Sequence, residues 1–190
     1  MKKLFITAIV FLCLGINSTN AQEPTFVKGD KVLNASIGLG SVLYSGLGYS
    51  TKVPPISASL EVGVVENFIV DDLTLGIGGY VGYSKYQWTY NQYNWGWSYT
   101  NLIVGGRAAV HYPLFEKLDT YAGVLAGVRI VTDKEFGNNN LGYSYTSNGG
   151  SGIAWSTYIG GRYYFTNRVA LLGEIGYGIS YLNIGLALKL

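Results

Sequence analysis

The feature that most constrains the fold is an alternation of apolar with small or polar residues along nearly the whole chain. For example, Leu60 and Val62 flank Glu61 in one of these segments. Such alternation predicts β-strands, because successive side chains of a strand point to opposite faces. Each segment is long enough to cross a bilayer at a tilt, which takes about 9–11 residues. The eight predicted strands are 31–40, 56–65, 72–85, 99–111, 119–131, 152–165, 169–178 and 181–190.

Composition points in the same direction. Charged residues make up 13% of the chain, against about 25% in typical soluble proteins. Hydrophobic residues reach 48%, but beyond the first residues no apolar run approaches the length of a transmembrane helix. The 27 glycines also disfavour helices.

The first 21 residues have the organisation of a signal peptide. Lys2 and Lys3 precede a short apolar run, and cleavage is expected after Ala21, leaving 22–190 as one barrel domain. Cleavage would lower the formal net charge from +2 to 0, so nothing in the charge suggests a nucleic-acid partner. It would also remove Cys13, the single cysteine, which follows Leu12 rather than the small residue that a lipoprotein signal needs.

The connections alternate in length. Those at 66–71, 112–118 and 166–168 are short, whereas those at 41–55, 86–98 and 132–151 are long, and only the tight turn near 178–180 departs from the pattern. Short turns at one end and long loops at the other are typical of outer-membrane barrels. We therefore predict an all-β, eight-stranded antiparallel up-and-down transmembrane β-barrel with its long loops outside the cell.

Alternation alone does not say which face lies inside. The less apolar face consists mainly of Gly, Ser, Ala, Asn and Tyr, which suit the narrow lumen of eight strands better than a solvated surface. The outward charges, Lys31 and Lys85, fall at strand ends. Six charges have inward parity and predict a structural network that plugs the lumen, with Arg162 and Glu174 as the first candidate pair: Glu61, Arg107, Arg129, Arg162, Glu174 and Lys189.

Few residues suggest chemistry. His111 is the single histidine, which excludes a multi-histidine metal site, and no cofactor or metal is expected. We place His111 inside the barrel at the periplasmic end and predict that it forms hydrogen bonds that close the bottom of the lumen. A lipid A-modifying enzyme would need its histidine at the opposite end.

The segment 86–99 interleaves aromatic and amide residues, a composition suited to recognition because it combines rigid apolar area with adaptable hydrogen bonding. The next loop adds asparagines at 138–140 and tyrosines near 143–145. The alternative is that two strands continue above the membrane as a hairpin with the aromatic residues paired across it. The candidate recognition residues are Trp88, Tyr90, Tyr93, Trp95 and Trp97.

The chain resembles the small outer-membrane β-barrels related to the OmpA transmembrane domain and to OmpX. The resemblance rests on 20–22, 105–109, 121–123, 160–165 and 181–186, and it covers essentially all of 22–190. It implies a bacterial outer-membrane location, contact with lipid and lipopolysaccharide, and insertion by the barrel-assembly machinery. Such proteins usually end in an aromatic residue, whereas this chain ends in Leu190.

Three functions are compatible with this sequence. We expect a non-enzymatic barrel that supports the envelope and presents loops for adhesion or for binding a surface or extracellular ligand. The alternatives are a small pore or transporter and a lipid A-modifying enzyme.

Overall fold

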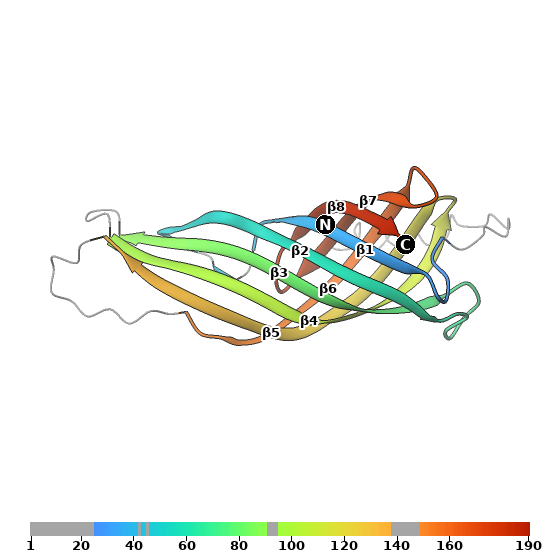
Figure 1. The fold of residues 1–190 in the computed structure, drawn as a ribbon, viewed down its shortest axis with the longest axis horizontal. Coiled ribbons are helices and arrows are strands. Elements are labelled where there is room, and N and C mark those ends of the chain that lie inside the picture. The colour runs from blue at the N-terminus through green and yellow to red at the C-terminus, as the bar shows by residue number, and fades with distance from the viewer. Residues whose placement is uncertain (1–24, 42, 45, 91–94, 138–148) are drawn as a thin grey trace, which may run out of the picture.

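A computed structural model of the chain describes residues 25–41, 43–44, 46–90, 95–137 and 149–190. The expected signal peptide, Tyr93 and the loop residues 138–148 lie outside these ranges. Eight strands pair antiparallel in chain order, and β8 returns to β1, so the sheet closes into a barrel (Figure 1). The predicted architecture is therefore confirmed. The strands are β1 (Lys31–Leu39), β2 (Tyr49–Val65), β3 (Thr74–Tyr90), β4 (Trp95–Phe115), β5 (Leu118–Phe136), β6 (Gly152–Tyr164), β7 (Val169–Tyr177) and β8 (Leu182–Lys189).

The barrel closes along a seam between its first and last strands. Val32 pairs with Lys189 at one end of this seam, and Leu39 pairs with Leu182 at the other. The start of β1 and the end of β8 thus share one rim with the turns after β2, β4 and β6, and we call it the terminal rim. At the opposite rim, Gly178 (φ 118°) allows the tight β7–β8 turn, where a Cβ would lie 2.0 Å from the Trp155 carbonyl oxygen.

The distribution of exposure is the reverse of that in a soluble barrel. On β1, Leu33, Ile37 and Leu39 are all more than 40% exposed, whereas Asn34 between them is buried. The same order holds on β6, where Ile159 is exposed and Arg162 is buried. An apolar outer surface that surrounds a polar interior suits a barrel whose solvent is lipid. Among the described residues, no helix is long and apolar enough to cross a membrane.

Four neighbouring strands continue beyond the rest of the barrel (Figure 1). Pairing of β1 with β2 ends at Ile56, and pairing of β5 with β6 ends at Arg129, yet β2 and β5 both continue past these points. β3 and β4 continue with them, paired as far as Tyr90 and Trp95. We call residues 49–55, 84–90, 95–101 and 130–136 the four-stranded extension, and the rim that carries it the projecting rim.

The extension corrects the predicted strand boundaries. β2 begins at Tyr49 rather than at residue 56, although Pro54 and Pro55 lack the N–H groups that a strand uses for pairing. Register shifts on both sides of Val53 accommodate them. β3, β4 and β5 likewise include residues that were expected in loops, and the alternative of an extended aromatic hairpin is confirmed.

Candidate functional site

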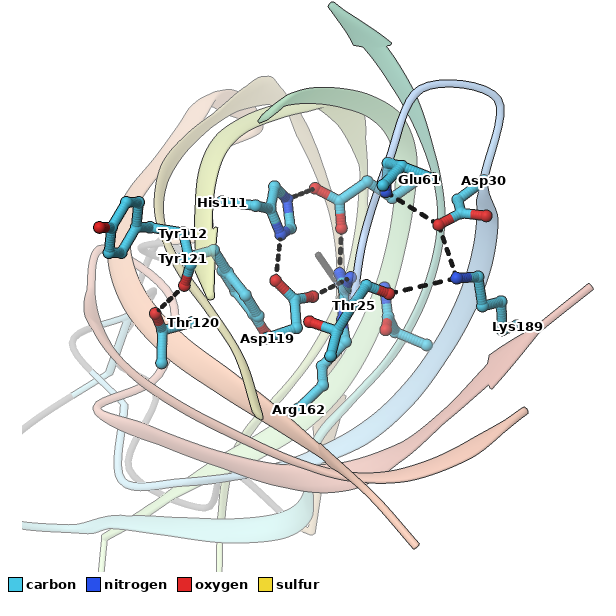
Figure 2. A network of polar contacts seen from close by, with 12 residues as sticks. Thr25, Asp30, Glu61, His111, Tyr112, Asp119, Thr120, Tyr121, Arg162 and Lys189 are labelled. Carbon is cyan, nitrogen blue, oxygen red and sulfur yellow. Dashed lines mark hydrogen bonds and ion pairs between the residues drawn. The ribbon is translucent and has the colours of Figure 1, made fainter. Parts of the chain in front are cut away.

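Four charged side chains form a closed ring inside the barrel near the terminal rim (Figure 2). Glu61, His111, Asp119 and Arg162 come from β2, β4, β5 and β6, and each is at most 2% exposed. His111 Nε2 lies 2.9 Å from Glu61 Oε1, and Nδ1 lies 2.8 Å from Asp119 Oδ1. Arg162 donates to the remaining oxygen of each carboxylate, at 3.0 Å for Asp119 Oδ2. We call these residues the lumenal ring.

The hydrogen bonds of the ring match those of an imidazolium between two ionised carboxylates. An ionised carboxylate only accepts hydrogen bonds, so with both carboxylates ionised both nitrogens of His111 donate and the ring is an imidazolium. Two positive charges then balance two negative charges. This balance of charge offsets part of the desolvation cost of burying four ionisable groups, although Arg162 Nε has no hydrogen-bond partner among the described residues.

Glycine on β3 makes room for the ring. At Gly76 a Cβ would lie 2.8 Å from Glu61 Oε1 and 3.1 Å from His111 Nε2. On β3, Gly79 has the opposite parity, and a Cβ there would meet nothing within 4 Å. The inward glycine thus has a steric role that the outward one lacks.

A second ion pair lies beside the lumenal ring. Arg107 Nη2 on β4 lies 2.7 Å from Glu174 Oε1 on β7, and both side chains are buried. Tyr121 on β5 donates to the same carboxylate oxygen at 2.8 Å. The Arg107 guanidinium also lies 4.4 Å from the ring centroid of Tyr158, within the range of a cation–π contact. This pair therefore links strands on opposite sides of the lumen.

The predicted Arg162–Glu174 pair does not form. The two residues are on adjacent strands, but Arg162 lies opposite Leu172 while Glu174 lies opposite Gly160. Their side chains instead reach other strands, where Arg162 meets two carboxylates and Glu174 meets Arg107. Their position on adjacent strands did not predict the pairing, because long side chains can reach across so narrow a lumen to other strands.

The other two expected lumenal charges lie nearer the rims. Lys189 Nζ is 2.6 Å from Asp30 Oδ2 and donates to the Thr25 carbonyl oxygen at the terminal rim. Arg129, toward the projecting rim, donates to the carbonyl oxygen of Gly150. Neither contacts the lumenal ring in the described part of the chain.

The residues before β1 cover the lumenal ring from the terminal rim. Phe26 is buried, and its ring centroid lies 4.2 Å from that of His111. Gly29 N donates to the Gly63 carbonyl oxygen, and Gly63 N donates to the backbone carbonyl oxygen of Asp30. These two hydrogen bonds anchor the segment against β2. The apolar ring of Phe26 thereby shields the ion pairs from water on that side.

His111 is buried inside the barrel near the terminal rim and forms hydrogen bonds, as we expected from the sequence. The sequence reading missed its partner Asp119, the first residue of the expected strand 119–131. Asp119 lies two residues before Tyr121 and therefore shares its inward face, which is the signal in the sequence that could have identified it. Phe26 and Asp30 were missed because they precede the first periodic segment.

The lumenal ring is suited to structural closure rather than to reaction. Both nitrogens of His111 are engaged by carboxylates, which leaves neither free to accept a proton from a substrate. Among the described residues, no group of three or more histidine, cysteine or acidic side chains is placed to hold a metal ion.

Four of the five candidate recognition residues belong to the described part of the chain, and these four lie on the inward face of the four-stranded extension. Trp88 pairs across the hairpin with Trp97, and Tyr90 pairs with Trp95. Trp95 is only 2% exposed, and its indole N–H donates to Glu135. Trp88 and Trp97 are half-buried, whereas Tyr90 is 43% exposed.

A tyrosine cluster lies below these tryptophans. The Tyr44 ring, between β1 and β2, lies 4.9 Å from Tyr86 and 5.0 Å from Tyr99, with Tyr49 alongside. Tyr44 Oη donates to Asn101 Oδ1 at 3.3 Å. Tyr44 lies outside the strands, and burial raises the pKa of its hydroxyl above the ordinary value of 10.0. The aromatic residues thus pack on one another above the lumen.

Comparison with known proteins gave likenesses in structure alone. No protein-family model matches the chain, and no curated protein sequence matches it. A structure described as de novo design of transmembrane β-barrels has 20% identity and a TM-score of 0.46, covering 86% of this chain and 97% of that one. The N-terminal β-barrel domain of Pseudomonas aeruginosa OprF has 14% identity and a TM-score of 0.39, covering 86% and 98%. Neither likeness assigns a function, and the architecture is read from the strand pairing itself.

Proposed function

We propose that the protein is a non-enzymatic barrel of the bacterial outer membrane that supports the envelope and presents its four-stranded extension for surface binding or adhesion. The observation that carries this proposal is the lumenal ring, in which four charged side chains from four strands are joined by ion pairs inside the barrel. In this arrangement the terminal rim faces the periplasm and the projecting rim faces outward.

The filled lumen supports a structural role over transport. An eight-stranded lumen is just wide enough to be filled by side chains. Phe26 covers the lumenal ring on one side, and the Arg107–Glu174 pair adds a second buried contact. A passing ion would have to separate paired charges that are buried from water, and a buried charge that has lost its partner is strongly unfavourable.

The four-stranded extension supports the binding role. It places aromatic residues beyond the ends of the four shorter strands, and Tyr90 at the end of β3 is exposed. Tyr and Trp supply rigid contact area at a low entropic cost, which is why binding loops use them. The buried Trp95 stiffens the hairpin, and the accessible surface comes from its neighbours.

Two measurements test the proposal. Purified barrel in planar bilayers should give no stable single-channel steps, and reproducible steps would favour a pore instead. Cells that express the protein should bind polysaccharide-coated or polystyrene surfaces better than cells that carry a variant lacking residues 88–97. Trp155→Ser, a lipid-facing substitution outside the extension, is the control and should leave binding unchanged. Equal binding by the deletion variant on every surface would remove the adhesive role.

Lipid A chemistry provides a further check. We expect lipid A from overexpressing cells to be unmodified, because His111 lies at the terminal rim and is enclosed by carboxylates. A modified lipid A that reverts to normal with His111→Ala would contradict the non-enzymatic assignment.

A further inference from the structure

The outward face of the four-stranded extension carries a basic hollow of about 590 Å³. Lysines come from β2, β3 and β5, and hydroxyl side chains from β4 and β5 lie between them. We call this feature the lysine hollow. Its basic and hydroxyl side chains are those of Lys52, Lys85, Lys134, Ser98, Thr100 and Thr132.

Strand register places these groups side by side. Thr100 on β4 lies opposite both Lys85 and Thr132, and Ser98 lies opposite Lys134. Neighbouring strands are about 4.8 Å apart, so the four strands carry this array over about 14 Å. An ordered row of ammonium and hydroxyl groups on that scale matches one polar headgroup better than a single small ion.

The lysine hollow begins where the apolar outer surface ends. On each of β3, β4 and β5 an exposed apolar or aromatic residue lies two positions from a member of the hollow, on the side away from the projecting rim. These neighbours are Tyr83 for Lys85, Leu102 for Thr100 and Ile130 for Thr132. One ligand could therefore lay apolar chains against the barrel and place its polar head in the hollow.

The described lining of the hollow carries a net positive charge, because it holds three lysines and one acidic residue, Glu135. None of the three lysines has an ion-pair partner among the described residues. Glu135 borders the hollow, but its carboxylate accepts the hydrogen bond from Trp95 on the inward face. Asp133 lies opposite Tyr99, which also belongs to the inward face.

We infer that the lysine hollow binds the phosphate groups of an outer-leaflet glycolipid, with the hydroxyl side chains hydrogen-bonded to its sugars. Lysine binds phosphate as a point charge, and each basic residue near an anionic membrane surface strengthens binding about 5-fold. The adjoining apolar surface favours a lipid over free phosphate. This inference uses the outer-membrane location proposed above and is independent of adhesion and of conductance.

Titration of diphosphoryl lipid A into the folded barrel in neutral detergent, followed by native mass spectrometry, tests the inference. The triple variant K52Q/K85Q/K134Q should bind on the order of 100-fold more weakly, from three such contributions. K52R/K85R/K134R should bind like the unaltered chain, because it retains the charges. K28Q/K31Q/K117Q, which removes three lysines near the terminal rim, is the matched control and should also bind normally.

Two further arms identify the source of the phosphate. Dephosphorylated lipid A should bind weakly and equally to the unaltered chain and the triple Gln variant. Inorganic phosphate at millimolar concentration should not compete; effective competition would indicate a free-phosphate site and overturn the lipid assignment. Equal loss in the terminal-rim control, or no loss in the triple Gln variant, would overturn the inference altogether.

Discussion

Replacing Arg162 by Met tests whether the lumenal ring holds the barrel together. Arg162 is fully buried between Glu61 and Asp119, and its guanidinium lies 4.7 Å from the ring centroid of Tyr121. Methionine keeps much of the volume but removes the charge. The ring would then hold one positive and two negative charges, all out of water.

The expected loss follows from that imbalance. Breaking a buried ion pair by removing one partner costs about 3–5 kcal/mol, because the other charge stays buried. With a urea slope of about 2 kcal/mol per M, the unfolding midpoint would fall by about 1.5–2.5 M. Reversible urea unfolding in lipid vesicles, followed by tryptophan fluorescence and by heat-modifiable gel migration, measures this change.

Arg129→Met is the matched control. Arg129 has the same inward parity but contacts a backbone carbonyl near the projecting rim, so its loss should cost about 0.5 kcal/mol or less. The double variant R162M/E61Q should lose less than the sum of its single changes, by about 1–3 kcal/mol, because the two residues are directly coupled. A loss for Arg162→Met no larger than that of the control would refute the reasoning.

Two other predictions test the geometry. Gly76→Ala should cost about 1–3 kcal/mol of unfolding free energy, since its methyl would crowd Glu61 and His111, whereas Gly79→Ala on the same strand should be nearly neutral. Equal urea midpoints for these two variants would contradict the packing of the lumenal ring. In single-tryptophan variants, brominated phospholipid should quench Trp155, which is 52% exposed on the outer surface, but not the buried Trp95. The opposite quenching order would mean that the barrel faces have been assigned the wrong way round.

The strands that do not continue into the four-stranded extension were predictable from sequence, because their outward and inward faces differ strongly in polarity. A slip by one residue would expose every polar side chain of such a strand to lipid, so periodicity alone identifies β1, β7 and β8 nearly to their ends. The four-stranded extension was less predictable. Outside the apolar belt both faces can be polar or aromatic. Pro54 and Pro55 also argue against a strand in the sequence, although the register shifts of β2 accommodate them.

The lumenal residues were predictable as a set but not as pairs. Parity placed Glu61, Arg107, Arg162 and Glu174 inside, and the structure buries all four. Their partners depend on which strands face one another across the closed lumen, and no local pattern contains that information. Asp119 was overlooked because it is the first residue of the predicted strand 119–131 and lies close to the charged turn at 116–117.

The lumenal ring has a consequence for how the barrel assembles. Arg162 and Glu61 are 101 residues apart, whereas His111 and Asp119 are 8 apart, so β4 and β5 can form half of the ring long before β6 arrives. If β6 then docked one residue out of register, Arg162 would face lipid and two carboxylates would share one imidazolium. The ring therefore favours correct strand alignment, since its charges balance only when β2, β4, β5 and β6 are all in register.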